Sequence, residues 1–294
     1  MAVFASILLS LIALYALLCL ALYRHYRISY TGGERLLIAL PSGHFCSLYH
    51  RPNPNKRHAR PVILCHGLGA NRYNLDFPGH SLAEHLRKEG FDVYVAELRG
   101  AGPKPGPKLF GRPDWRFDFD DLVAEDVPAL IARVKSETGA LDVLWCGHSM
   151  GGMLMYAYLS QGGTGVAAAF AIASPAALGT LPDSKRLARL TRLARFLPYF
   201  PQPLLVALCL PLGTGRFLPF FLKNLIMPGT VPTPRSRQLM STMFARLPLG
   251  LANQFGMWLE TNRFTSRDGK HDYLADLATV RVPFGFVAGA GDRL

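Results

Sequence analysis

Residues 143–156 read VLWCGHSMGGMLMY, an apolar run that passes through a serine flanked by glycines into a second run with helical spacing. Within it, Gly147 to Gly151 match the pattern G-x-S-x-G. In this pattern a strand ends in a sharp turn and a helix begins at once, which leaves the serine hydroxyl exposed above the sheet. Side chains at Gly147 and Gly151 would collide with the neighbouring elements. We therefore predict that Ser149 is a nucleophile.

Around this motif, short apolar runs alternate with amphipathic ones. A predicted hairpin at residues 35–51 precedes strand-like runs at 60–67, 91–100, 141–147 and 166–174 and a strand that runs into a Gly-rich loop at 280–292. Helical spacing occupies 80–90, 119–139 and 151–163. Strands that alternate with helices predict a mainly parallel sheet with right-handed crossovers and helices on both faces. Reactive groups in such sheets gather at the carboxyl ends of the strands.

The helix predicted over residues 119–139 contains a proline. Val123, Val127 and Leu130 belong to its apolar face, and Gly139 is its expected end. Proline in the interior of a helix removes a backbone hydrogen bond. The helix is therefore expected to begin, in effect, close to Pro128.

The first 22 residues after Met1, Ala2 to Tyr23, carry no charge. A helix of that length spans roughly 33 Å, which is enough to cross a bilayer. Arg24 and Arg27 follow the apolar run, whereas a cleavable signal peptide has its positive charges before it. We predict an uncleaved single-pass membrane anchor, with the rest of the chain on the cytoplasmic side.

Strand and helix alternation stops between about residues 175 and 265, which predicts an inserted helical cap. The expected division is an anchor with its basic flank at 1–28, a first core part at 29–175, the cap at 176–265 and an incomplete second core part at 266–294.

The net charge of +12 is concentrated in that cap. Residues 181–246 hold ten Lys or Arg and one acidic residue, Asp183, and residues 183–197 form a basic amphipathic stripe. The charge excess predicts attraction to anionic lipid headgroups, with a solvated face as the alternative. The stripe itself is expected to pack on the core, with a position in the membrane interface as the alternative. No nucleic-acid-binding motif accompanies the charge, so no nucleic-acid partner is predicted.

The five cysteines do not form a disulfide framework in the sequence, which indicates a reducing compartment. Cys65 and Cys146 end apolar runs and are interpreted as small buried hydrophobic residues, with a redox pair between them left open. No metal-binding cluster or dinucleotide fingerprint is present, so no metal and no cofactor is predicted. The oligomeric state is left undetermined.

A second candidate element follows the earlier strand, at His66 to Gly69. Acyl transfer turns a carbonyl oxygen into an anion that preorganised N–H donors stabilise. We predict the backbone N–H groups of Leu68 and Met150 as these donors, with Gly67 in the same loop. His66 is expected to shape the loop and not to act as a base.

Four segments in order, HGLGANRYNLD, GFDVYVAELRG, WRFDFDDLVAEDVPALIARVKSETG and GHSMGG, resemble the α/β-hydrolase superfamily. In more detail they resemble its acid lipase-like branch, whose members hydrolyse esters of fatty acids and usually carry glutamine where Met150 stands. The resemblance implies an α/β-hydrolase fold. It also implies a catalytic acid after a late strand, and Asp292 in VAGAGDRL matches that position; a turn-forming role for Asp292 is the alternative.

Chain order in this superfamily is serine, then acid, then histidine. No histidine follows Asp292, so we expect the 294 residues to be a fragment that lacks the last strand, the catalytic histidine and the final helix. His271 is the remaining alternative as the base.

Together these features predict a membrane-anchored serine hydrolase that cleaves carboxylic esters with an apolar acyl chain through an acyl-enzyme. Its expected partners are a small-molecule ester or lipid substrate and the membrane. Two alternatives remain: an acyltransferase that uses the same serine, and a non-catalytic membrane-associated scaffold of the same fold.

Overall fold

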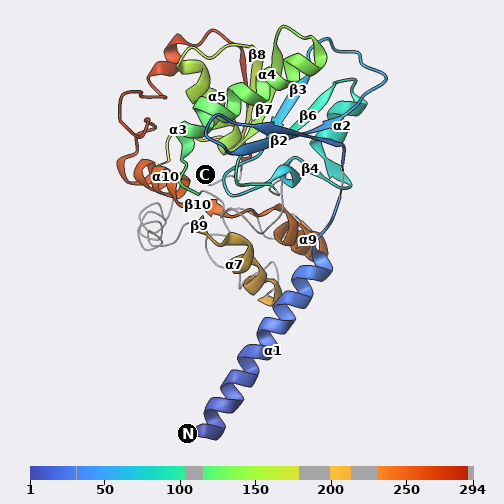
Figure 1. The fold of residues 1–294 in the computed structure, drawn as a ribbon, viewed down its shortest axis with the longest axis vertical. Coiled ribbons are helices and arrows are strands. Elements are labelled where there is room, and N and C mark those ends of the chain that lie inside the picture. The colour runs from blue at the N-terminus through green and yellow to red at the C-terminus, as the bar shows by residue number, and fades with distance from the viewer. Residues whose placement is uncertain (31, 103–114, 179–198, 213–230, 291–294) are drawn as a thin grey trace. The chain divides into compact units, whose positions relative to one another are not determined.

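The computed structural model describes residues 1–30, 32–102, 115–178, 199–212 and 231–290. The chain divides into two compact units (Figure 1). Met1–Tyr30 and Pro201–Phe244 form the smaller unit, and Thr31–Phe200 and Ala245–Leu294 form the larger one.

The larger unit is built on a sheet of seven described strands in the order β1-β2-β6-β3-β7-β8-β11. Their bounds are β1 Glu34–Ala39, β2 Phe45–Arg51, β3 Val62–Cys65, β6 Val93–Glu97, β7 Val143–His148, β8 Val166–Ile172 and β11 Phe284–Val287. β1 and β2 form an antiparallel hairpin, β2 is antiparallel to β6, and the other neighbours are parallel. The predicted hairpin and the mainly parallel sheet are confirmed.

Side chains alternate between two hydrophobic cores, one on each face of this sheet. In β3, Ile63 and Cys65 point into one core, and Val62 and Leu64 point into the other. Helices α4 (Val127–Thr138) and α5 (Met150–Ser160) pack against the first core, and α2 (Leu82–Lys88) packs against the second. Helices therefore cover both faces, as predicted, and the central strand β3 is apolar at every position as a strand buried on both faces requires.

The two cysteines at strand ends lie on opposite faces. Cys65 belongs to the first core, whereas Cys146 on neighbouring β7 belongs to the second. Burial raises the pKa of Cys146 to about 11, so its thiol stays protonated at neutral pH. This arrangement favours two buried apolar side chains over a redox pair.

Pro128 changes the helix that was predicted over residues 119–139. A short helix α3 (Phe119–Asp121) leads into a π-helical turn, Leu122–Asp126, and α4 begins at Val127. Within the wide turn the Val127 N–H donates to the Leu122 carbonyl. Proline has no N–H to donate, so the turn widens just before it. Gly139, at φ 70°, ends α4 as predicted.

Further elements complete the described part of the larger unit. They are η1 (Arg72–Asn74), the pair β4 (Asp76–Phe77) and β5 (His80–Ser81), the pair β9 (Tyr199–Phe200) and β10 (Leu247–Pro248), α10 (Leu249–Thr261) and η5 (Asp276–Thr279). Trp258 of α10 is buried among Phe119, Phe255 and Phe264. Helix α10 and the residues on either side of it therefore belong to the core on one face of the sheet.

The smaller unit contains α1 (Ala2–Tyr26), α7 (Gln202–Cys209), η4 (Leu210–Leu212) and α9 (Thr233–Met243). Within the described residues, Val3–Tyr26 is the one helix long and apolar enough to cross a membrane, by length and composition. The predicted cap at 176–265 is thus divided: 201–244 groups with α1, and 245–265 groups with the sheet. The predicted basic stripe at 183–197 lies outside the described residues.

Candidate active site

Ser149 is the single residue between the end of β7 and the start of α5. Its backbone is at φ 51° and ψ −119°, a region that residues with side chains rarely occupy. The Ser149 N–H donates to the Ile172 carbonyl at 2.8 Å, and its carbonyl accepts from the N–H groups of Gly152 and Met153 at 2.9 and 3.1 Å. These bonds hold the strained turn between β8 and the first turn of α5.

The glycines of the motif stand where no Cβ fits. A Cβ on Gly147 would lie 2.1 Å from the Gly151 carbonyl carbon, and one on Gly151 would lie 2.4 Å from the Cys65 carbonyl oxygen. Trp145 adds a brace, because its indole N–H donates to the Gly151 carbonyl at 2.9 Å. Helix α5 consequently starts in direct contact with the end of β3.

The loop after β3 passes beside Ser149. A Cβ on Gly67 would lie 3.1 Å from the Ser149 Cβ. The Gly67 N–H donates to Asn74 Oδ1 at 3.1 Å, and the Gly69 carbonyl accepts from the Ala245 N–H at 2.8 Å. Half-buried Leu68 lies between these two anchored glycines. The loop is thus held in place next to the serine.

Met150 begins α5 on the other side of the turn. N–H groups in the first turn of a helix have no acceptor within the helix, and the helix dipole makes this end positive. The first turn of α5 is therefore suited to bind a negative oxygen.

His66 is buried, with 3% of its surface exposed, and both ring nitrogens are engaged. Nε2 accepts from the Leu98 N–H at 3.2 Å, so Nδ1 carries the proton and donates to the Gly67 carbonyl at 2.9 Å. Burial lowers the pKa of His66 to about 4, which keeps the ring neutral. This geometry supports the loop-shaping role proposed for His66.

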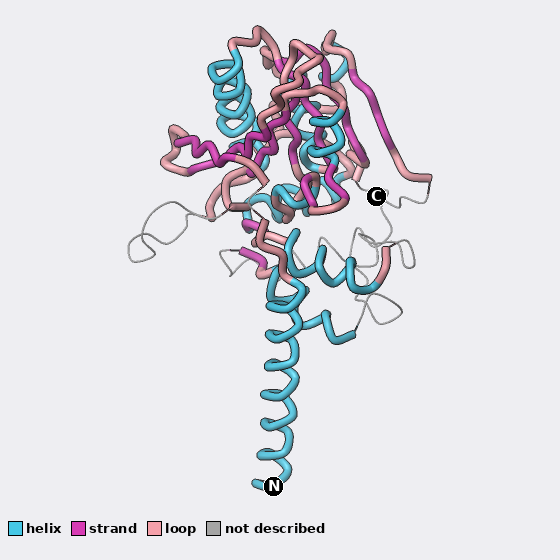
Figure 2. The backbone as a smooth tube through the Cα atoms, turned by 90° about the vertical axis from the view of Figure 1, so that its right-hand side faces the viewer, coloured by secondary structure: helices cyan, strands magenta, loops and turns pink. Residues whose placement is uncertain are grey.

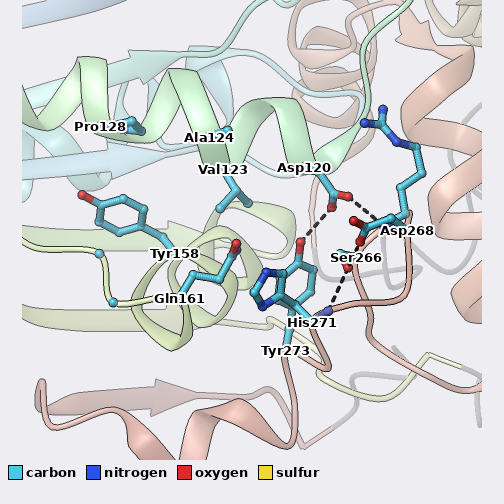
Figure 3. Close-up of a pocket in the computed structure, with 13 residues that line it drawn as sticks. Asp120, Val123, Ala124, Pro128, Tyr158, Gln161, Ser266, Asp268, His271 and Tyr273 are labelled. Atoms are coloured by element: carbon cyan, nitrogen blue, oxygen red, sulfur yellow. Dashed lines mark hydrogen bonds between the residues drawn. The ribbon is translucent and has the colours of Figure 1, made fainter.

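His271 lies far from the serine. It lines a pocket of about 430 Å³ with Gln161 and Gly162 (Figure 3). Gln161 follows the last residue of α5, whereas Ser149 precedes the first. The 11 residues of α5 extend about 16 Å, whereas a base must reach its proton donor within about 3 Å. The structure does not bring His271 to Ser149.

The same pocket is built around a carboxylate that is fully engaged. Asp120 accepts from the Tyr273 hydroxyl at 2.8 Å, from the Arg267 N–H at 2.7 Å and from Gln254 Nε2 at 2.6 Å. Figure 3 shows the first two of these bonds. They tie residues 254–273 to the start of α3, and Ser149 is not among the residues that line this pocket.

The predicted acid, Asp292, lies outside the described residues. The strand before it, β11, pairs with β8 and ends at Val287 opposite Ile172. Ile172 is also the residue whose carbonyl receives the Ser149 N–H. The carboxyl ends of β7, β8 and β11 therefore lie side by side.

Two residues that the pattern did not single out also shape this site. Asn74 accepts a hydrogen bond from the Gly67 N–H. In the sequence, the only indication of this role is that Asn74 lies seven residues after Gly67. Gly152 faces Ser174, whose Oγ would be 2.2 Å from a Cβ on Gly152. In the sequence, the indication for Gly152 is that it is a second glycine directly after Gly151. Among the described residues, no group of three or more His, Cys, Asp or Glu is arranged to hold a metal ion.

Known proteins resemble this chain in sequence and in fold. A family model described as the α/β hydrolase fold matches residues 60–292. The human lysosomal acid lipase/cholesteryl ester hydrolase is 30% identical over 181 residues, which cover 53% of this chain and 45% of that protein. Human gastric triacylglycerol lipase is 34% identical over 110 residues, 35% of this chain and 27% of that protein.

The chain spans less than half the length of these two curated relatives. Among solved structures, a hydrolase from Pseudomonas aeruginosa superposes with a TM-score of 0.56 at 17% identity, over 89% of this chain and 83% of that one. At this identity the superposition shows the shared fold.

Proposed function

The chain belongs to the α/β hydrolase fold family, and on that premise we propose that it is a serine hydrolase that cleaves carboxylic esters with an apolar acyl chain. The observation that carries the proposal is the strained Ser149 turn, at φ 51° and ψ −119°, with the Gly67 loop beside it. Strain of this kind persists when surrounding contacts impose it, and it concentrates at functional sites.

In the proposed reaction the Ser149 Oγ attacks the ester carbonyl carbon, and the carbonyl oxygen becomes an anion. The backbone N–H groups of Leu68 and Met150 stabilise that anion. Collapse of the intermediate releases the alcohol and leaves the acyl group on Ser149, and water then releases the fatty acid.

The Ser149 proton passes to a histidine that Asp292 orients, and this histidine returns the proton to the leaving alcohol. We assign this base to neither His66 nor His271. Both nitrogens of His66 are engaged in the loop, and His271 lies at the other end of α5.

Two features support a lipid-like ester as the substrate. The relatives in the comparison include proteins named as a cholesteryl ester hydrolase and a triacylglycerol lipase. Helix α1 has the length and composition of a membrane span, and we propose that it anchors the chain with the larger unit on the cytoplasmic side. A hydrolase anchored in a membrane is held at the bilayer, where apolar substrates accumulate.

The test compares two serines of the same segment in the membrane-incorporated protein expressed from its complete coding sequence, so that the histidine base of the proposed reaction can take part. We expect Ser149→Ala to abolish labelling by a fluorophosphonate probe and to lower hydrolysis of p-nitrophenyl esters by roughly 10³-fold or more. Ser160→Ala is the matched control, because Ser160 ends α5 and its hydroxyl donates to the Ala157 carbonyl. The control should retain the unmodified chain's labelling and rate.

Ester turnover that survives Ser149→Ala would contradict the assignment. Absence of labelling in both the unmodified chain and the control would favour the non-catalytic scaffold. Product analysis with an added alcohol separates hydrolysis from acyl transfer, since an acyl-enzyme that excludes water gives mainly the new ester, whereas a hydrolase gives mainly the free fatty acid.

A further inference from the structure

Helix α7 and the turn η4 that follows it carry no charged residue from Gln202 to Leu212. Val206, Cys209 and Leu210 are buried, in a cluster that includes Leu22 and Tyr23 of α1. The opposite side of the segment exposes a stripe of leucines at i, i+4 and i+8. Leu204, Leu208 and Leu212 are 58%, 38% and 44% exposed. An element that is apolar all round is typical of a nonpolar environment.

The contacts of α7 fix its level along α1. The Leu208 carbonyl accepts from the Tyr15 hydroxyl at 2.7 Å and lies 4.0 Å from the Cys19 Sγ. Cys19 is buried, although the other described residues from 3 to 20 are exposed. Figure 1 and Figure 2 both show α7 alongside α1.

The position at which the end of α7 contacts α1 lies well inside the apolar part of α1. Tyr15 and Cys19 precede the first charge, Arg24, by nine and five residues, or about 8 to 14 Å along the helix axis. Half of a bilayer's hydrocarbon core is about 15 Å thick. If α1 crosses the bilayer, the end of α7 lies within one leaflet.

The hydrogen bond from Tyr15 is the kind that such a position requires. Carbonyl groups in the last turn of a helix have no partner within the helix. In hydrocarbon no water is available, so each such carbonyl needs a protein donor. The Tyr15 hydroxyl supplies that donor to the carbonyl of Leu208, the last residue but one of α7.

Polar and charged groups lie at the C-terminal end of α1. Arg24 and Arg27 are exposed at the end of α1, and α9 is attached at the same level. The Ile28 N–H donates to Thr242 Oγ1 at 3.0 Å, and Arg237 donates to the Tyr26 hydroxyl at 3.4 Å. Arginine and tyrosine are typical of the headgroup region, and long basic side chains there extend toward it.

We infer that α7 and η4 are inserted in the bilayer beside α1, with the leucine stripe Leu204, Leu208 and Leu212 in contact with lipid acyl chains. The occupant of this apolar face is the bilayer, because the face continues the exposed apolar surface of α1. This inference rests on the anchor that is part of the proposed function.

The test uses tryptophan fluorescence in vesicles of phosphatidylcholine brominated on its acyl chains. The native tryptophans, Trp115, Trp145 and Trp258, are buried in the larger unit and give the baseline. Leu208→Trp and Leu204→Trp report on the stripe, and Leu9→Trp, at a 66% exposed position of α1, reports on the anchor. Leu141→Trp, at an 85% exposed position of the larger unit, is the matched aqueous control.

We expect brominated lipid to reduce the added emission of Leu208→Trp and Leu204→Trp by a fraction comparable with that of Leu9→Trp, and to leave Leu141→Trp unchanged. Quenching of Leu9→Trp without quenching of either stripe variant would overturn the inference and leave the anchor intact. Unquenched Leu9→Trp would overturn both, and esterase assays of Ser149 would remain an independent test of the chemistry.

Discussion

At the scale of single residues, the Ser149 turn depends on close approaches between backbones. Gly151 lets the first turn of α5 contact the Cys65 and His66 carbonyls, and Gly67 lets the loop after β3 reach the serine. Any side chain at these positions would push apart the two segments that present the proposed oxyanion donors. The absence of a side chain at these glycines therefore allows the backbone segments of the site to approach one another.

We expect Gly151→Ala to lower the free energy of unfolding by several kcal/mol and to reduce esterase activity with it. The added Cβ would meet backbone atoms at 2.4 to 2.9 Å, and these cannot move without displacing β3. Gly162→Ala is the control at the other end of the same helix. No atom lies within 4 Å of its Cβ, so only its positive φ of 80° costs about 1 kcal/mol. Urea unfolding of both variants checks this, and equal losses would contradict it.

At the scale of elements, a buried ion pair connects the end of β6 to the π-helical turn. Arg99 donates through Nε to Asp126 Oδ2 at 2.5 Å and through Nη2 to Glu125 Oε2 at 2.6 Å, and its backbone N–H donates to Asp126 Oδ1. Both Asp126 and the side chain of Arg99 are almost fully buried. The π-helical turn places two consecutive acidic residues against one guanidinium.

Asp126→Ala should destabilise the protein by up to about 3 to 5 kcal/mol, because it removes the fully buried carboxylate and leaves the buried Arg99 guanidinium paired only with the partly exposed Glu125. Glu137→Ala provides the comparison on α4. Glu137 pairs with Arg133 at 2.8 Å, but both side chains are more than a third exposed, so about 0.5 kcal/mol or less is expected. Thermal or denaturant unfolding measures both losses. If Asp126→Ala lowered the free energy of unfolding no more than Glu137→Ala does, the ion pair would not stabilise the contact between the end of β6 and the π-helical turn.

At the scale of the whole molecule, the stability of the fold depends on pH through His66. Its pKa in the folded state, about 4, is below the unfolded value of about 6.5. The unfolded chain therefore binds more protons between these values, and the contribution of His66 to stability is complete above pH 6.5 and is lost as pH falls to 4.

The loss amounts to about 3 kcal/mol at most over this range. We expect the unfolding free energy of the unmodified chain to fall more steeply with acid than that of His66→Gln, which keeps an acceptor for the Leu98 N–H. The difference between the two pH profiles isolates His66, because all other titratable groups are common to both. Parallel profiles would mean that His66 is not held neutral.

Local patterns were sufficient for the elements that lie near one another in the chain. The apolar run within residues 60–67 predicted a strand buried on both faces, and the serine between Gly147 and Gly151 predicted a turn from strand to helix, because each pattern reflects contacts repeated over a few residues. The sequence by itself also determined the family, through motifs in a set order, and the long apolar helix at the N-terminus.

Other features depend on contacts between residues distant in sequence, and only the tertiary structure decided them. Asn74 and Ala245 hold the loop that carries Leu68, and His271 is separated from Ser149 by the length of α5. The grouping of α7 with α1 belongs to the same class, since Tyr15 and Leu208 are 193 residues apart. No local periodicity encodes such pairs, because which apolar faces meet is determined by the packing of the whole chain.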